Sequence, residues 1–353
     1  GSRYALMELS ALINSPLDGR EIRKRAMKAA KQLMNAEAAS LLLVDREKDE
    51  LFFEVALGDK GNLLKEIRLR FGEGIAGWVA LNGEPLIIDD VYGDPRFYRA
   101  ADEKSRFVTR DMICVPVRFR DRILGVLEVI NKREGRFGEE DLPLLLAFSN
   151  QVAIAVENSN LYEQLRETFF GTALSLADSL EKRDPYTGGH TKRVSTYSVA
   201  IGRVLGLDAG EMEILTLVAI LHDIGKIGVR DNVLLKEGKL DESEYASMVR
   251  HAGYGAEILS HVKGLQPVMA GVKAHHEMYD GSGYPDRISG DRIPLAARIV
   301  AVADTFDAMT TDRPYRKALT FDRAFADLSR CSGRQFDPVV VDAFLRAHGE
   351  GML

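Results

Sequence analysis

The sequence predicts a multidomain protein in which an α+β domain with a central, mainly antiparallel sheet is joined by a long helix to an all-α domain. The first observation is the length of 353 residues, which suits two or three domains of about 100–200 residues each. The second is that helix and strand patterns alternate up to residue 138, whereas helical patterns dominate from residue 184 onward. The third is that all seven histidines lie at or after His190, which predicts different roles for the two halves.

The N-terminal part begins with an expected amphipathic helix over residues 21–37, where apolar side chains recur at helical spacing. Five β-strands are expected, at residues 39–45, 51–57, 83–91, 112–119 and 123–131. The first two and the last two are near enough in sequence to form hairpins, the second of them turning at Arg120-Asp121. The order helix, hairpin, loops, hairpin, helix predicts an α+β domain, which we place at residues 1–155.

Residues 139–183 predict a long helix, because they contain one early proline and a single glycine, Gly171, where the helix would break. Apolar residues recur there at gaps near multiples of about 3.5, the period of a coiled coil: Leu144, Ala147, Ile154, Leu161 and Leu165. Gln151 and Asn158 interrupt this seam. We expect a connecting helix at 156–182, a homodimer formed through residues 140–170, and an all-α domain at 183–353. The alternative is that the last helix of one domain simply runs into the first of the next.

Composition excludes several classes of protein. With 46% hydrophobic and 28% charged residues the chain is an ordinary globular protein, neither disordered nor collagen-like. The formal net charge of −6 gives no global basic field, so no nucleic-acid polymer is expected as a partner.

The two cysteines, Cys114 and Cys331, cannot form a disulfide framework and show no CxxC pattern, which favours a reducing compartment and a cytoplasmic location. No apolar run reaches the ~18–20 residues that cross a bilayer, so no membrane span is expected within these residues. The opening Gly1-Ser2 is typical of a cloning remnant, which leaves room for a membrane span or a sensor upstream.

The histidines of the second half stand beside carboxylates in apolar surroundings. His222-Asp223 ends the apolar run LTLVAIL, where burying such a pair is costly unless it is partnered or binds a metal. His275-His276 is an adjacent pair whose side chains on a helix would point ~100° apart, toward different ions. Asp304 interrupts a further apolar helix, and His190 and His251 lie in other helical segments.

A single buried histidine is more often a core residue than a ligand, but this combination favours a metal site. Imidazoles and carboxylates without a thiolate suit Fe, Mn or Zn, of which we expect Fe or Mn. There are too many candidates for one ion, so two metals ~3.5–4 Å apart and bridged by a carboxylate are expected.

The segments HDIGKIGV at 222–229, RDPYTGGHTKRV at 183–194 and residues 275–316, which include Gly283-Tyr284-Pro285, resemble the HD-GYP family. The resemblance covers most of residues 165–345. The family is a branch of the HD-domain metal-dependent phosphohydrolases, and its members hydrolyse the bacterial second messenger cyclic di-GMP. The resemblance implies seven metal ligands, with Asp223 as the bridging carboxylate: His190, His222, Asp223, His251, His275, His276 and Asp304.

The resemblance also implies roles around the metals. Lys226 matches a lysine that contacts the scissile phosphate, so that Asp223 and Lys226 are the expected catalytic residues; the alternative is that Lys226 only complements a helix dipole. Tyr284 lies in the loop that shapes the substrate pocket. Three basic residues match those that hold the ligand's phosphates, or else form a solvated surface cluster: Arg313, Arg316 and Lys317.

Three carboxylates are lesser candidates. Some family members hold a third metal through an acidic residue shortly before the first histidine; here Asp184 lies six residues before His190, and two metals remain the expectation. Glu277 and Asp307 are each expected to accept a hydrogen bond from a ligand histidine. His261 and His348 are expected to take no part.

Residues 71–91, 94–97 and 124–132 resemble a GAF domain, roughly over 5–155. The resemblance implies a small-molecule sensor and a dimerisation module, with a ligand that the sequence does not identify. A cyclic-nucleotide signature is matched by Asn131, Lys132, Phe137 and Asp141, but Leu142 replaces its glutamate, which argues against that ligand.

The expected function is metal-dependent hydrolysis of cyclic di-GMP to linear pGpG, with further hydrolysis to GMP left open, under regulation by the GAF domain through the connecting helix. Two alternatives stay open. One is a hydrolase of another cyclic dinucleotide. The other is a weakly active interaction protein that binds cyclic di-GMP.

Overall fold

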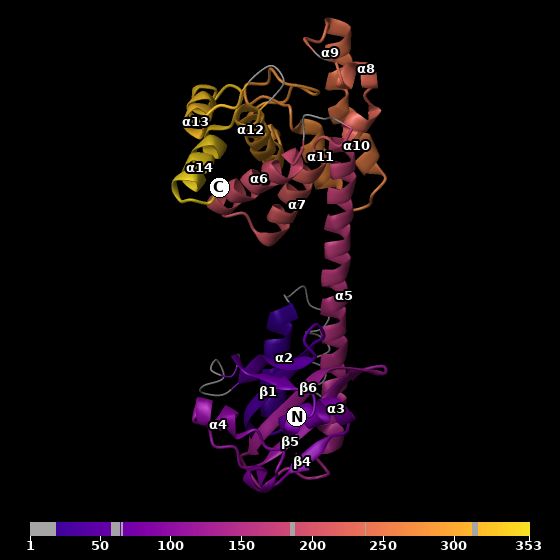
Figure 1. Ribbon diagram of the computed structural model, residues 1–353, viewed down its shortest axis with the longest axis vertical. Coiled ribbons are helices and arrows are strands. Elements are labelled where there is room, and N and C mark those ends of the chain that lie inside the picture. The colour runs from indigo at the N-terminus through magenta and orange to yellow at the C-terminus, as the bar shows by residue number, and fades with distance from the viewer. Residues whose placement is uncertain (1–18, 58–63, 65, 184–187, 237, 313–316) are drawn as a thin grey trace. The chain divides into compact units, whose positions relative to one another are not determined.

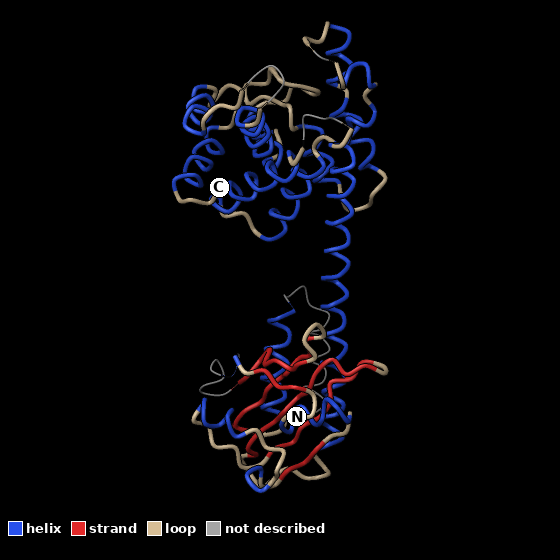
Figure 2. Tube along the Cα trace, viewed as in Figure 1, coloured by secondary structure: helices blue, strands red, loops and turns tan. Residues whose placement is uncertain are grey.

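The computed structural model describes residues 19–57, 64, 66–183, 188–236, 238–312 and 317–353 (Figure 1). The chain divides into two compact units between Leu165 and Arg166. The first unit holds a six-stranded sheet and the second is helical (Figure 2). The predicted combination of an α+β domain and an all-α domain is therefore confirmed.

The sheet of the first unit is antiparallel, with strand order β3-β2-β1-β6-β5-β4. Its strands are β1 (Ala36–Asp45), β2 (Glu50–Leu57), β3 (Arg68–Arg70), β4 (Leu86–Ile88), β5 (Met112–Phe119) and β6 (Arg122–Lys132). The helices around it are α2 (Gly19–Leu33), α3 (Gly74–Asn82), α4 (Arg99–Ser105) and a 3-10 turn η2 (Val91–Gly93).

Two predicted elements are shorter than expected. The first helix ends at Leu33 rather than residue 37, because Ala36 already pairs with Lys132 in the sheet. The strand expected at 83–91 keeps only Leu86–Ile88. Gly83 closes α3 with a φ of 70°, and Val91 begins the turn η2, so the backbone is extended only between them.

The two faces of the sheet carry separate cores. On one face the side chains of β6 such as Leu127 and Val129 pack with Met27 of α2 and Phe148 of α5 (Leu142–Glu181). On the other face the core contains Val126 and residues of α3. Because side chains alternate along a strand, Glu128 lies on this second face, between Val126 and Ile130.

Helix α5 is continuous through Gly171, so the expected break is not there. A glycine inside a helix costs only about 1 kcal/mol relative to alanine, which 40 residues of helix can accommodate. In the first unit α5 buries one stripe of apolar side chains but exposes Ile154, Leu161 and Leu165; in the second it buries Ala173 and Ala177. Of the predicted seam, Leu144 is half-buried against the core and Ala147 is exposed.

The second unit is a bundle whose core is built on α6 (His190–Leu205), α7 (Ala209–Leu221), α12 (Leu295–Thr310) and α14 (Pro338–Gly349). Phe306 and Phe344 are fully buried at its centre, with ring centroids 4.9 Å apart. The remaining helical elements are η3 (Ile224–Gly228), α8 (Asp231–Leu234), α9 (Glu242–Val249), α10 (His251–Ser260), α11 (Gln266–Ala274), η4 (Gly290–Arg292) and α13 (Phe321–Arg330). Among the described residues, none of the helices has the length and apolar character that a membrane span requires.

Candidate metal centre

Most of the predicted ligands lie at helix ends of the second unit, where the chain changes direction. His190 is the first residue of α6 and His251 the first of α10. His222 directly follows α7, and His275 directly follows α11. Asp304 is the exception, because it lies inside α12. Four chain turns and one helix face are thereby brought to one place.

Gly225 explains how the segment after His222 reaches the start of α10. A Cβ at Gly225 would lie 1.8 Å from the carbonyl oxygen of His251 and 2.4 Å from the amide nitrogen of Gly255. Only glycine permits this approach of two backbones. The glycine of the HDxGK run thus places Asp223 and Lys226 beside His251.

The first ligand group consists of His190, His222 and Asp304, whose ligand atoms all lie within 4.8 Å of one another. The Nε2 atoms of His190 and His222 are 3.3 Å apart, and Nε2 of His190 is 3.5 Å from Oδ1 of Asp304. Both imidazoles are almost fully buried. Three ligand atoms from three helices therefore converge on one point.

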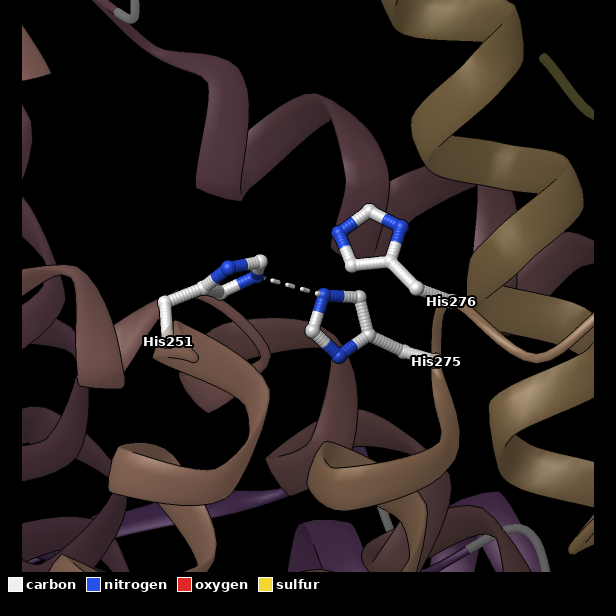
Figure 3. Close-up of side chains that lie close together, drawn as sticks. All are labelled: His251, His275 and His276. Atoms are coloured by element: carbon white, nitrogen blue, oxygen red, sulfur yellow. Dashed lines mark hydrogen bonds between the residues drawn. The ribbon is translucent and has the colours of Figure 1, made fainter. Parts of the chain in front are cut away.

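The second ligand group consists of His251, His275 and His276 (Figure 3). The Nε2 atoms of His251 and His275 are 3.3 Å apart, and the ring centroids of His275 and His276 are 4.0 Å apart. The adjacent pair therefore contributes both of its rings to this one group. The expectation that neighbouring rings would point to different ions is not met, because the helix ends at Ala274, before both residues.

Asp223 lies between the two groups and directs one oxygen at each. Its Oδ2 atom is 3.5 Å from Nε2 of His222 and 3.9 Å from Nε2 of His190. Its Oδ1 atom is 3.6 Å from Nε2 of His251. This is the position that a carboxylate bridging two cations would occupy.

The opposite nitrogen of three imidazoles is fixed by a backbone carbonyl three residues earlier. Nδ1 of His222 donates to Ala219 at 2.8 Å, Nδ1 of His251 to Met248 at 2.7 Å, and Nδ1 of His275 to Val272 at 2.6 Å. In a neutral imidazole this leaves Nε2 without a proton. The Nε2 atoms of His251 and His275 then face each other as two acceptors, an arrangement that a cation between them resolves.

Burial and neighbouring groups keep the imidazoles of the second group uncharged. Burial, reinforced by the neighbouring imidazoles, lowers the pKa of His275 well below its usual range and lowers the pKa of His276 to about 3. Burial likewise lowers the pKa of His251. Burial opposes ionisation of Asp223, but Lys226 and the surrounding histidines outweigh it and hold the pKa of Asp223 well below its usual range. Neutral imidazoles and an ionised carboxylate are the forms that bind metals.

His190 is held by a buried carboxylate that is itself held by an arginine. Its Nδ1 donates to Oδ2 of Asp307 at 2.7 Å, and Arg193 donates to both oxygens of Asp307. Burial works to lower the pKa of His190, but the hydrogen bond to Asp307 and the charges of Asp304 and Asp223 raise it overall. Arg193 was not predicted, although its position three residues after His190 puts both on one helix face.

Lys226 and Tyr284 flank the ligand groups. Nζ of Lys226 is 2.7 Å from Oδ2 of Asp223, so its charge lies at the centre of the site. The ring of Tyr284 stacks on that of His276, with centroids 4.9 Å apart and 30° between the planes. Burial raises the pKa of Tyr284, which keeps its hydroxyl protonated.

Glu277 does not meet the expectation that it accepts a hydrogen bond from a ligand histidine. Its Oε1 accepts from the backbone amides of Asp286 at 2.6 Å and Arg287 at 3.0 Å. Glu277 therefore holds the loop that follows Gly283-Tyr284-Pro285. Gly283 is required there, because a Cβ would lie 2.3 Å from the amide nitrogen of Met278.

Those of the remaining predicted residues that the structure describes lie outside the cluster. Lys317 is exposed and forms no hydrogen bond or ion pair within the described part of the chain. Asp184, Arg313 and Arg316 lie outside the described residues. His261 is exposed, and His348 stacks on Phe325 away from the ligand groups.

Glu181, the last residue of α5, also contributes to the site and was not predicted. Its carboxylate accepts hydrogen bonds from the backbone amides of Gly189, at 3.0 Å, and of Thr191. These amides flank His190 at the start of α6. The end of α5 is thereby bonded to the first turn of the helix that carries the first ligand.

Comparison with known proteins gives two domain matches. The HD domain family matches residues 175–340, and the GAF domain family matches residues 18–156. HD domains are metal-dependent, which agrees with the two ligand groups.

Curated relatives match between about half and three quarters of this chain. The chain is 38% identical over 271 residues to the cyclic di-GMP phosphodiesterase response regulator RpfG of Xanthomonas campestris pv. campestris, covering 75% of this chain and 68% of that protein. It is 37% identical over 250 residues to 3'3'-cGAMP-specific phosphodiesterase 2 of Vibrio cholerae, covering 70% of this chain and 48% of that protein. It is 40% identical over 187 residues to a cyclic di-GMP phosphodiesterase of Thermotoga maritima, covering 52% of this chain and 51% of that protein.

The chain thus spans about half the length of two of these relatives and two thirds of the third. The matched segment includes the HDxGK run, the adjacent histidines and Gly283-Tyr284-Pro285 in one helical unit. By these motifs, the ligand geometry and its relatives, the chain belongs to the HD-GYP family, with a GAF domain ahead of its HD domain.

Proposed function

We propose that the chain hydrolyses cyclic di-GMP to linear pGpG in its HD domain. The observation that carries the proposal is the position of Asp223, with one carboxylate oxygen toward each of two three-residue ligand groups. Two relatives that share this domain are named cyclic di-GMP phosphodiesterases. In the domain organisation we propose, residues 1–155 form the GAF domain, 156–182 the connecting helix and 183–353 the catalytic domain.

Two divalent ions held by the two groups would neutralise the phosphodiester's charge and lower the pKa of a water that attacks phosphorus. The protein's own residues orient this chemistry. Asp307 and Arg193 fix the ring of His190, and backbone carbonyls fix three other rings. Lys226 stabilises negative charge that develops on the phosphate. Tyr284 forms a wall of the substrate pocket beside His276.

We further propose that the ions are Fe or Mn, because the donors are imidazole and carboxylate without a thiolate. Two ions are proposed; Asp184 is the candidate ligand for a third. Metal analysis of protein purified without added metal and without oxygen tests both points. Two equivalents of Fe or Mn per chain are expected, and one equivalent or a zinc-only preparation would contradict this part of the proposal.

Turnover of cyclic di-GMP tests the activity. Wild type, His222→Ala and Asp223→Ala are assayed with Mn(II) or Fe(II), and His261→Ala serves as a matched control because this histidine is exposed and lies outside the ligand groups. We expect activity in the wild type and the control, and none in the two ligand variants. Equal, negligible rates in all four proteins would instead support an interaction protein that binds cyclic di-GMP.

A second substrate class is favoured by one observation: a relative at 37% identity is named a 3'3'-cGAMP-specific phosphodiesterase. Comparing kcat/KM for cyclic di-GMP and for 3'3'-cGAMP with the same protein distinguishes the two. A higher value for 3'3'-cGAMP would replace the proposed substrate but keep the reaction. The same time course reports whether pGpG accumulates or proceeds to GMP.

We propose that the chain forms a homodimer through the exposed apolar side chains of α5, which include Leu161 at 52% and Leu165 at 69% exposure. The two lie four residues apart and so share one face of the helix. Light scattering of Leu161→Glu/Leu165→Glu tests this, with Glu163→Gln on the same exposed turn as control. We expect a dimer for wild type and control and a monomer for the double variant; a monomeric wild type would overturn the proposal.

Regulation by the GAF domain is proposed to act through α5, because Glu181 at its end bonds the amides beside His190. A small-molecule ligand of the GAF domain would alter the position of these amides and thereby of the first metal ligand. Unchanged turnover and metal affinity after deletion of residues 1–150 would contradict this.

A cytoplasmic location is proposed because both cysteines are free.

A further inference from the structure

The first unit contains a cavity on the second face of its sheet. Its volume is about 80 Å³. Apolar side chains of the sheet and of the covering helices form most of its wall, among them Phe53, Leu69, Ile75 and Ile130. Strand β6 contributes a carboxylate to this wall, that of Glu128.

Glu128 differs from the other acidic residue of the cavity in having no hydrogen-bond or ion-pair partner among the described residues. Asp102 accepts hydrogen bonds from the hydroxyl of Tyr92 at 2.8 Å, and from the amide and hydroxyl of Thr109 at 2.8 and 2.6 Å. Glu128 is only 7% exposed, and no hydrogen bond or ion pair to it is found within the described ranges. A buried acid without a partner is rare, because its desolvation is uncompensated.

The neighbours of Glu128 leave that carboxylate open to a ligand. Ser40 on β1 and Cys114 on β5 are its register partners. No lysine, arginine or histidine is among the described residues that line the cavity. Burial raises the pKa of Glu128 to about 7, so near neutrality a nearby cation would favour the ionised form.

The size of the cavity limits the ligand. Its volume is about half of the ~150 Å³ of an apolar cavity that holds benzene, so a short aliphatic chain fits better than a nucleotide. The residues matching the cyclic-nucleotide signature are also engaged elsewhere: Lys132 and Asp141 form an ion pair of 2.5 Å and do not line the cavity.

We propose that the GAF cavity binds a small aliphatic amine, with the ammonium group donating to the Glu128 carboxylate and to Ser40, and the apolar chain packed among Phe53, Leu69 and Ile75. Organic acids are excluded by like charge, and neutral alcohols lack the charge that compensates Glu128. The inference concerns the first unit and does not depend on the activity proposed for the second.

Calorimetric titration of the full chain with ethylamine, ethanol and acetate tests the proposal. Wild type is compared with Glu128→Gln, with Ala101→Leu, which fills the cavity wall on α4, and with Glu47→Gln, an exposed control. We expect one ethylamine per chain in wild type and in the control. Glu128→Gln and the change from amine to alcohol should each weaken binding at least tenfold, and Ala101→Leu should abolish it.

The pH dependence supplies a test that needs no variant. Among the described residues, the titratable groups near or facing the cavity are Glu128, Cys114, Asp102 and Tyr98. Burial raises the pKa of Cys114, and Asp102 is already hydrogen-bonded. Ionisation of Glu128 should tighten ethylamine binding about tenfold from pH 6 to pH 8 in wild type.

Three results would each overturn the proposal. The first is that ethylamine does not bind to wild type. The second is that ethanol binds as tightly as ethylamine, and the third is that folded Glu128→Gln binds ethylamine as tightly as wild type. If Glu128→Gln does not fold, Ser40→Ala and the wild-type pH series replace it, and a pH-independent affinity would overturn the proposal equally. Because binding is measured without turnover, its failure is distinct from failure of the phosphodiesterase assay.

Discussion

The two units treat buried charge in opposite ways. In the HD unit Asp223 and Asp307 are surrounded by cationic or hydrogen-bonding partners. Burial works to raise the pKa of each carboxylate, but these partners outweigh it and lower the pKa. In the GAF unit Glu128 is buried among apolar side chains, and its pKa is raised to about 7. The first arrangement is a prepared set of ligand atoms, whereas the second is a single carboxylate without a partner in the described part of the chain.

This difference indicates how far the function of each unit depends on side chains that are already held in place. A network in which every member is bonded holds its atoms in place before a metal or substrate arrives. An unpartnered carboxylate costs stability until a ligand compensates it. Four measurements test this contrast between the HD unit and the GAF unit, and they follow from the largest expected effect to the smallest.

The largest effect is expected for Lys226→Met in the HD unit. Removing one positive group from a site of developing charge typically costs about 10²–10³ in kcat. We therefore expect kcat for cyclic di-GMP to fall by about this factor while metal content stays near wild type. Lys263→Met, an exposed lysine elsewhere in the unit, is the control and should keep full activity. A loss below about threefold would assign Lys226 to helix-dipole stabilisation instead.

Metal removal should separate the units by stability. A ligand at 100–1,000 times its Kd stabilises the folded state by about 2.7–4 kcal/mol. Chelation should therefore lower the melting transition of the HD unit and leave that of the GAF unit unchanged, as followed by differential scanning calorimetry. A shift of both transitions, or of neither, would show that the ligand groups are not where metal binding stabilises the chain.

Glu128 predicts a pH dependence of the GAF unit with a defined sign. An acid whose pKa rises from 4.5 in the unfolded chain to about 7 in the folded chain binds more protons when folded between these values. Stability of the GAF unit therefore falls as pH rises from about 5 to 8, by on the order of 2–3 kcal/mol. Glu128→Gln should remove this slope, as measured by urea unfolding at each pH. A slope that persists in the variant would assign it to other groups.

The smallest effect is expected for Asp307→Asn, which keeps the shape of the side chain but weakens its hold on His190. Loss of such a partner typically costs about 10–100-fold in metal affinity. Competitive metal titration should show this loss in Asp307→Asn and none in Asp342→Asn, whose side chain is 71% exposed. Equal affinity in both variants would mean that His190 is oriented without Asp307.

Much of this site could be predicted because its signals are local. Burying a polar or charged side chain costs free energy unless it has a partner or binds a metal. This applies to His222-Asp223 at the end of an apolar helix, to the adjacent pair His275-His276 and to Asp304 inside an apolar helix. Helical spacing also predicts that Asp307 lies near Asp304. The structure brings all seven predicted ligands into two groups and Asp223.

Other features depended on residues far apart in the chain. Glu277 and Asp307 are both carboxylates close in sequence to predicted ligands, yet Asp307 bonds His190, 117 residues earlier, whereas Glu277 bonds the amides of Asp286 and Arg287. Sequence spacing within one helix cannot reveal which distant ring a carboxylate will reach. Glu181 was missed for the same reason, because its partners Gly189 and Thr191 lie beyond the helix that carries it.

The sequence by itself determined the two domain classes, the alternation that puts Val126, Glu128 and Ile130 on one face of β6, and which residues are candidate metal ligands. Only the tertiary structure decided that Asp223 directs one oxygen to each ligand group and that α3 and α4 line the same cavity as Glu128. The physical reason is that periodicity fixes which side chains share a face. What that face meets depends on how separate elements pack, and this decides whether a buried charge finds a partner.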